Sequence, residues 1–228
     1  RQRLFWPAWC GIGTLVISLL VGADGFAALL TFTLGGFASG AALRQLVLAT
    51  RRQSWRGLVG RANGGMVVHL GVILIAVALA ASNSYTRSQE LSLKLNTPAE
   101  FGGHVFELKG FETEKTDRLT AVKAIVQIDG GKSYAPAITK FVQMGNNIGT
   151  PSVKSSWRYD LYLTLEPPVK SESGEARIKV FIKPLVMWMW IGGGMMAAGT
   201  LLALFPGRRR RPTDAVSARV DTGKAIDA

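Results

Sequence analysis

The sequence predicts an α-helical integral membrane protein with four transmembrane helices and an extracytoplasmic all-β domain between the third helix and the fourth. Two observations support this class. The apolar residues gather in four long blocks, and none of these blocks contains an acidic residue. Between the last two blocks, short runs of β-branched and aromatic residues alternate with turn sequences.

Each block is long enough, or nearly so, to cross a bilayer. A hydrocarbon core about 30 Å thick requires roughly 20 mostly apolar residues in a helix, and flanking residues that reach the interface allow a shorter run. The blocks run from Phe5 to Val21, from Gly25 to Leu48, from Ala62 to Ala81 and from Leu185 to Phe205. Glycines are frequent in the last three blocks, including the pair Gly36 and Gly40, and are interpreted as sites of close helix packing.

Arginines predict which side of the membrane each loop faces. The formal net charge is +12, and much of it lies beside the apolar blocks, at Arg1, Arg3, Arg44, Arg51, Arg52, Arg56, Arg61 and Arg208 to Arg211. Because Lys and Arg accumulate on cytoplasmic loops, these positions are expected to face the cytoplasm. The predicted parts are therefore three helices in residues 1–81, an extracytoplasmic domain in 82–184, a fourth helix in 185–206 and a basic, disordered cytoplasmic tail in 207–228.

The extracytoplasmic segment is predicted to form about five to seven antiparallel strands in one small sandwich or barrel. Apolar runs begin at Val105, Ala121, Phe141, Tyr159 and Ala176. The turn sequences between them are Asp129-Gly130-Gly131, Gly145-Asn146-Asn147, Glu166-Pro167-Pro168 and Ser173-Gly174. In residues 161–165, leucines alternate with Tyr162 and Thr164, so one face of this strand is expected to be apolar.

Several functional classes find no support in the sequence. The β segment mixes charges of both signs, which does not resemble a nucleic-acid-binding face. The chain has no P-loop or dinucleotide fingerprint. Its single cysteine, Cys10, is expected to be a small buried apolar side chain. The chain does not begin with Met and lacks a signal-peptide cleavage pattern, so it is expected to be the back end of a longer protein.

His69 is the one ionisable residue deep in the third block, and it is the main candidate for a binding site. Ionisable groups inside a bilayer usually face the interior of a helix bundle or a cofactor. Helical spacing puts it on one face with Ala62, Gly65, Val72 and Ala76, where small side chains leave room for a flat macrocycle. Neutral imidazole is a good ligand of haem iron. The alternative is a structural histidine that is hydrogen-bonded to a neighbouring helix.

The second histidine, His104, follows Gly102-Gly103 in the extracytoplasmic segment. It has no Cys, His or carboxylate at metal-ligand spacing beside it. We therefore expect a turn histidine without a catalytic or binding role. The sequence identifies no catalytic residue.

Three stretches resemble the CcmF family, the large membrane subunits of the bacterial haem lyase for cytochrome c maturation. The first is Gly65-Met66-Val67-Val68-His69-Leu70-Gly71-Val72, the second is Arg158-Tyr159-Asp160-Leu161-Tyr162-Leu163, and the third is Ile182-Lys183-Pro184-Leu185-Val186-Met187-Trp188-Met189-Trp190-Ile191-Gly192-Gly193. Their order and spacing match the C-terminal part of the family. Met187 stands where the family often has Arg, and Val68 where it often has Ala.

The resemblance implies that His69 is one axial iron ligand of a haem b. It also implies that the second ligand and the family's periplasmic haem-handling residues lie outside this chain. The expected location is the bacterial inner membrane, with several spans and a periplasmic domain. Electrons from quinol would reduce haem delivered by a haem chaperone, and the haem would then be attached covalently to apocytochrome c. Thiol-handling and chaperone subunits would be further partners, and the segment on its own is not expected to be active.

Three alternatives remain open from the sequence. One is a non-catalytic assembly platform whose β domain holds partners. Another is the paralogous subunit dedicated to a nitrite reductase cytochrome. The third is a small-solute transporter, since a buried histidine among glycine-rich helices also suits a proton relay. The source of reductant, the partner surface and the topology of the β domain cannot be derived from the sequence.

Overall fold

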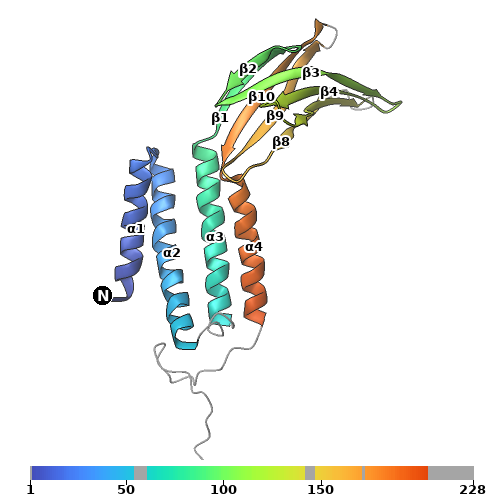
Figure 1. The fold of residues 1–228 in the computed structure, drawn as a ribbon. Helices are drawn as coiled ribbons and strands as arrows, with labels where there is room; N and C mark the ends of the chain where they lie inside the picture. The colour runs from blue at the N-terminus through green and yellow to red at the C-terminus, as the bar shows by residue number, and fades with distance from the viewer. Residues whose placement is uncertain (1, 54–60, 142–146, 171–172, 205–228) are drawn as a thin grey trace, which may run out of the picture. The chain divides into compact units, whose positions relative to one another are not determined.

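The computed structural model describes residues 2–53, 61–141, 147–170 and 173–204, which form two units (Figure 1). The helical unit comprises Arg1–Val77 and Trp190–Ala228, and the β unit comprises Ala78–Met189. Among the predicted loop arginines, Arg1, Arg56 and Arg208 to Arg211 lie outside the described residues, as does the predicted tail in 207–228.

Four helices were predicted, and the described residues contain four: α1 (Gln2–Leu20), α2 (Phe26–Gln53), α3 (Arg61–Ser84) and α4 (Val186–Leu204). Three are long and apolar enough to cross a membrane, over Phe26–Arg51, Asn63–Ser84 and Val186–Leu204, with mean hydropathies of 1.6, 2.3 and 1.4. The apolar part of α1, Leu4–Leu20, is shorter. The chain turns directly after this helix, where Gly22 and Gly25 have φ angles of +82° and +85°.

The glycine pair on α2 packs against α1. A Cβ atom on Gly40 would lie 2.7 Å from Cys10 Cβ, and one on Gly36 would lie 3.0 Å from Cys10 O. The lack of a side chain at these two positions therefore allows the close approach of the helices, as the packing interpretation expects. Cys10 itself is exposed, so the prediction that it is buried is wrong for this chain. One side of Cys10 faces Gly40, and that contact does not cover the residue.

Helices α3 and α4 meet at two points where each contributes a glycine. At the first, a Cβ on Gly64 would lie 2.6 Å from Gly199 O, and a Cβ on Gly199 would lie 2.8 Å from Gly64 O. At the second, the corresponding distances are 2.6 Å from Gly71 to Gly192 O and 2.8 Å from Gly192 to Gly71 O. Any Cβ atom there would collide with the backbone of the other helix. The two helices thus touch backbone to backbone, which assigns the face of α3 with Gly64 and Gly71 to helix packing.

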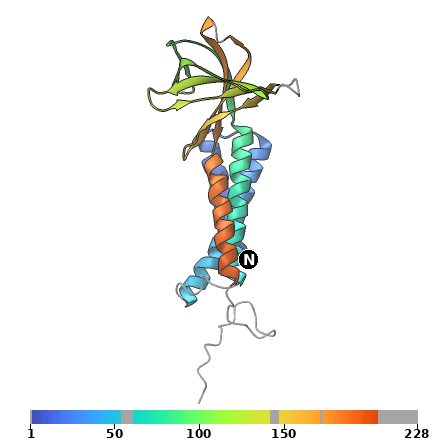
Figure 2. The same ribbon diagram turned by 90° about the vertical axis from the view of Figure 1, so that its right-hand side faces the viewer.

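The β unit contains ten strands in its described residues, arranged as two curved sheets (Figure 2). One sheet has the order β1-β10-β9-β8, and the other has the order β2-β3-β4-β6-β7 with β5 paired to β4. The strands are β1 (Arg87–Lys94), β2 (Pro98–Phe101), β3 (His104–Lys115), β4 (Leu119–Ile128), β5 (Ser133–Tyr134), β6 (Ala137–Phe141), β7 (Asn147–Thr150), β8 (Ser152–Lys154), β9 (Tyr159–Lys170) and β10 (Glu175–Pro184). All their pairings are antiparallel.

The two sheets share one apolar core, to which alternate residues of the long strands contribute. On β9 these are Leu161, Leu163 and Leu165, as the alternation in the sequence predicts. The other main contributors are Ile178, Val180 and Ile182 on β10, Phe106 and Leu108 on β3, and Ala124, Val126 and Ile128 on β4. Because both sheets bury residues in the same cluster, the β unit is one folding domain.

The predicted all-β segment is confirmed, but its strand count and one turn are not. Five to seven strands were expected and ten are present, because β1, β2, β7 and β8 are short or polar and carry weak apolar patterns. Glu166-Pro167-Pro168 is not a turn: it lies inside β9, at a bulge in the register between β9 and β10. Proline lacks the N–H that a regular ladder requires, and a bulge accommodates this loss. Residues 142–146, which hold most of the run from Phe141 and two residues of the turn after it, lie outside the described residues.

Candidate functional site

His69 lies on α3, and its ring is oriented by a hydrogen bond within the helix. Its Nδ1 atom lies 2.8 Å from the carbonyl oxygen of Gly65, one turn earlier. Because a carbonyl oxygen can only accept, Nδ1 carries the proton and donates it. The lone pair of the neutral imidazole is therefore on Nε2, which is the atom available to a metal or to another donor.

The face of α3 around His69 is open and lined by small residues. Apart from its chain neighbours and the nearby backbone of α3 itself, no described residue lies within 4 Å of a Cβ placed on Gly65. Val72 is 48% exposed, and Ala76 and His69 are exposed as well. The side chain of Ala62, predicted for the same face, lies outside the described residues. Because α3 packs on α4 through Gly64 and Gly71, His69 belongs to the part of the helix surface that those contacts leave uncovered.

His104 is the first residue of β3 rather than a turn residue, and both of its ring nitrogens have partners. Nδ1 lies 2.7 Å from Asp129 Oδ2, and Nε2 lies 2.8 Å from the hydroxyl of Tyr159. Only 13% of the His104 side chain is exposed. Asp129 also accepts hydrogen bonds from the Val105 amide at 3.0 Å and from Lys154 Nζ at 3.0 Å.

These contacts determine the acidity of Asp129. Partial burial by itself would raise the pKa, but the hydrogen bonds from His104, from the Val105 amide and from Lys154 outweigh it and lower the pKa from 3.8 to about 2. Reasoning from the sequence missed this cluster because Asp129 and Tyr159 lie 25 and 55 positions from His104.

The second stretch that carries the family resemblance lies beside the first part of the third stretch in the β unit. The amide of Leu185 donates a hydrogen bond to Arg158 O at 2.9 Å, and Lys183 Nζ lies 5.0 Å from the centre of the Tyr162 ring. Burial and the nearby Asp160 carboxylate raise the pKa of Tyr162. Two segments that are far apart in the sequence thus form one junction at the start of α4.

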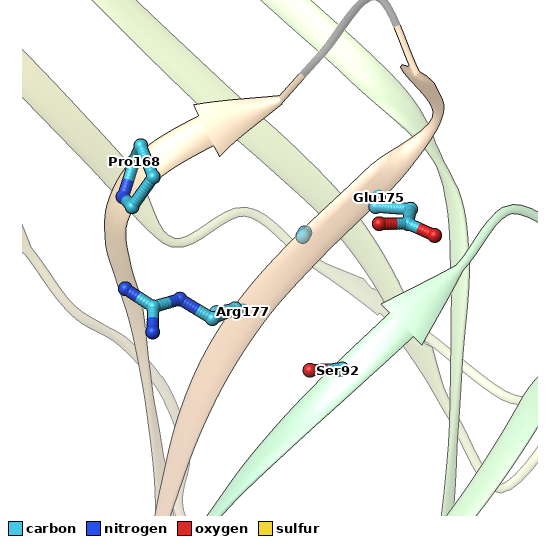
Figure 3. Close-up of a pocket in the computed structure, with 5 residues that line it drawn as sticks. Ser92, Pro168, Glu175 and Arg177 are labelled. Carbon is cyan, nitrogen blue, oxygen red and sulfur yellow. The ribbon is translucent and has the colours of Figure 1, made fainter.

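A shallow pocket of about 270 Å³ lies on the four-stranded sheet and is lined by Ser92, Pro168, Glu175, Ala176 and Arg177 (Figure 3). The positively charged side chain in this pocket, Arg177, already has partners: it donates a hydrogen bond to Pro167 O and pairs with Glu90 at 3.3 Å. We therefore assign no chemistry to this pocket.

Comparison with known proteins supports the resemblance. No protein-family model matches the chain. It is 26% identical over 201 residues to the cytochrome c-type biogenesis protein CcmF of Pseudomonas aeruginosa and 28% identical over 172 residues to CcmF of Haemophilus influenzae. These matches cover 85% and 71% of the chain. A solved structure named cytochrome c heme lyase CcmF matches 90% of the chain with a TM-score of 0.66 and 26% identity.

The chain is similar to CcmF proteins over most of its length. The NrfE protein of Haemophilus influenzae, also a cytochrome c-type biogenesis protein, is similar to a comparable degree, with 26% identity over 73% of the chain. The chain spans 26% to 34% of the length of these CcmF and NrfE proteins. The resemblance to CcmF found in the sequence is thereby confirmed, whereas the role of His69 as an iron ligand stays a prediction.

Proposed function

We propose that this chain is part of a membrane subunit of the haem lyase of cytochrome c maturation, and that His69 is one axial ligand of a haem b. The similarity to CcmF supports the general role. The observation that supports the site is the hydrogen bond from His69 Nδ1 to Gly65 O. It leaves Nε2, on an open face of α3, without a partner among the residues that the structure describes.

The residues around His69 fit such a group. Histidines that ligate a metal commonly donate their other N–H to a backbone carbonyl, which sets the tautomer and the orientation of the ring. Gly65 supplies this carbonyl, and the absence of a side chain there, together with the small Ala76, leaves room beside the imidazole. A bound haem b supplies one-electron redox chemistry. The other histidine of the chain lies in the β unit, so we assign the second axial ligand to a helix outside these 228 residues.

The wider role follows from the same proposal. Electrons from quinol reduce haem that a haem chaperone delivers, and the haem is then attached to apocytochrome c. The β unit lies in the periplasm and holds partners of the reaction, including thiol-handling subunits. In this arrangement α1 is the fourth span of a bacterial inner-membrane protein, with flanking residues that compensate for its shorter apolar run.

The similarity to NrfE favours one second candidate. In that case the same haem-ligand site serves a subunit dedicated to a nitrite reductase cytochrome. The two candidates share His69 and differ in the apocytochrome that receives the haem. Complementation of strains that lack one or the other subunit distinguishes them.

The test of the site is the haem content of the full-length protein purified from membranes. His69→Ala should remove most of the low-spin b-type absorbance per mole of protein, because the iron loses an axial nitrogen and alanine offers no donor atom. Added imidazole should restore part of the spectrum by entering the space that the side chain vacates. Leu201→Ala, at an exposed apolar position of α4 outside this face, is the control and should keep its haem.

Insertion of each variant in the membrane is measured in parallel, so that loss of haem is not confused with loss of protein. If His69→Ala protein is well inserted and keeps a full complement of low-spin haem b, the ligand assignment is wrong. His69 is then a structural helix histidine, hydrogen-bonded to Gly65.

A further inference from the structure

An exposed tryptophan and an exposed arginine lie next to each other in the loop between β8 and β9. Trp157 is 60% exposed, and Arg158 beside it is exposed as well. The loop is well ordered around them, because the buried carboxylate of Asp160 accepts hydrogen bonds from Ser155 Oγ at 3.1 Å and from the Ser156 amide at 3.2 Å. The exposed side chain of Trp157 therefore belongs to a loop that hydrogen bonds to Asp160 hold in place.

The same loop is attached to the first turn of α4. The indole nitrogen of Trp188 donates a hydrogen bond to Trp157 O at 3.1 Å, and the ring centres of the two tryptophans are 4.8 Å apart. The Leu185 amide donates to Arg158 O at 2.9 Å, and the Trp188 amide donates to Leu185 O at 3.0 Å. Two hydrogen bonds and one ring contact therefore attach the loop to the start of α4, whose first turn is closed by the third hydrogen bond.

Helix α4 is a candidate membrane span from Val186 to Leu204. At a rise of about 1.5 Å per residue, Trp188 lies roughly 3 Å from the beginning of this span, which is where a transmembrane helix leaves the hydrocarbon core. The ring centres of Trp157 and Trp188 are 4.8 Å apart, with the ring planes tilted by 50°, so Trp157 lies close to that level. Tryptophan and arginine are the residues that the membrane–water interface favours, the indole at the headgroup boundary and the guanidinium beside lipid phosphates.

We propose that residues 155–158 form a membrane-surface anchor of the β unit, with Trp157 inserted among lipid headgroups and Arg158 paired with their phosphates. The continuity of this loop with the span favours lipid over a protein partner as the occupant. The proposal rests on α4 crossing the bilayer, as the proposed function requires. This anchor fixes the distance between the β unit and the bilayer. It does so through a contact other than the two points where the chain connects the β unit to α3 and α4.

The test measures depth in the membrane with a nitroxide label on the full-length protein in phospholipid vesicles. Trp157→Cys is made in a cysteine-free background that includes Cys10→Ala, because Cys10 is the one cysteine of these 228 residues. Lys132→Cys, on the exposed β4–β5 turn, is the control in water, and Leu201→Cys, where the native side chain is 61% exposed on α4, is the control in lipid. The depth of each label is derived from two collision rates. One is with oxygen, which concentrates in lipid, and the other is with a water-soluble nickel chelate.

The label at position 157 should collide more with oxygen and less with nickel than the label at 132, and it should lie shallower than the label at 201. Equal values at 157 and 132 would overturn the anchor, and protection of position 157 from both reagents would overturn it in favour of a protein partner. A label at 201 that behaves as if in water would instead remove the span on which the proposed function depends.

A second measurement does not require a cysteine at position 157. Lipids brominated close to the headgroup quench tryptophans at that depth, so Trp157→Phe should lower the fraction of total tryptophan fluorescence that these lipids quench. An unchanged quenched fraction in a folded Trp157→Phe protein contradicts the proposal.

Discussion

The Nδ1 atom of His104 lies 2.7 Å from Asp129 Oδ2, although 25 positions separate the two residues. Tyr159 is bonded to the other ring nitrogen, so this one imidazole connects the start of β3, the turn after β4 and the start of β9. Its partners belong to both sheets of the β unit. The contacts assign His104 a structural role, which the predictions below separate from the proposed role of His69.

We expect His104→Ala to destabilise the β unit and to leave haem binding intact. The substitution removes two hydrogen bonds and leaves the Asp129 carboxylate and the Tyr159 hydroxyl with fewer partners, at a cost of about 1 to 3 kcal/mol. Thermal unfolding of the purified protein should show the loss, while haem b content and cytochrome c yield at permissive temperature stay near wild type. Lys132→Ala is the surface control. A loss of cytochrome c as large as that of His69→Ala would assign His104 a functional role.

Asp129 should make the free energy of unfolding of the β unit depend on pH in the acidic range. The pKa of Asp129 is lowered from 3.8 to about 2 in the folded protein, so the folded state favours the charged carboxylate. This contribution is fully present above about pH 4 and is lost as the pH falls toward 2. The free energy of unfolding of wild type minus that of Asp129→Asn should therefore be constant near neutral pH and shrink between pH 4 and pH 2. A difference that stays constant across this range would contradict the assigned pKa.

Neighbouring glycines on α4 should respond differently to alanine. A Cβ on Gly192 would lie 2.7 Å from Ile75 Cγ1 and 2.8 Å from Gly71 O. Apart from its chain neighbours and the nearby backbone of α4 itself, no described residue lies within 4 Å of a Cβ on Gly193. Gly192→Ala should cost about 1 to 3 kcal/mol through overpacking, and Gly193→Ala should be neutral or slightly stabilising because alanine favours helix. Thermal stability in detergent compares the two variants. Equal effects would mean that α3 and α4 do not meet at this point.

The side of the membrane on which the β unit lies can be measured by labelling of single cysteines in intact cells. In a Cys10→Ala background, Lys132→Cys should react with a membrane-impermeant maleimide. Gln53→Cys, at the end of α2, should react only after the inner membrane is permeabilised, because the arginines nearby retain that loop in the cytoplasm. The reverse pattern would invert the proposed topology.

The sequence predicted the structure best where a single physical requirement determines the local fold. A bilayer demands long apolar helices, so α2, α3 and α4 were recognised from length and hydropathy. The burial of the β9 leucines followed from alternation. Helical spacing also put Gly65 one turn below His69, where its carbonyl is found to orient the ring. For these features, neighbours in the sequence determine the outcome.

Prediction from the sequence failed where contacts between residues far apart in the sequence determine the structure. The apolar pattern of β1 is confined to Leu91 and Leu93, and this strand is recognised only through its pairing with β10. The prolines of β9 suggested a turn, and the bulge that retains them in the strand depends on the register of β10. The partners of His104 come from two other parts of the fold. No local pattern identifies such contacts in advance.

The first and last strands of the β unit are paired, with Arg87 opposite Ile182. Its entry from α3 and its exit to α4 are therefore adjacent, which is the geometry of a domain inserted into a helical hairpin. A domain whose ends meet can be exchanged, enlarged or shortened without altering the separation of the two helices that flank it. The helices α3 and α4 do not tolerate such changes at Gly64, Gly71, Gly192 and Gly199, where their backbones are in contact.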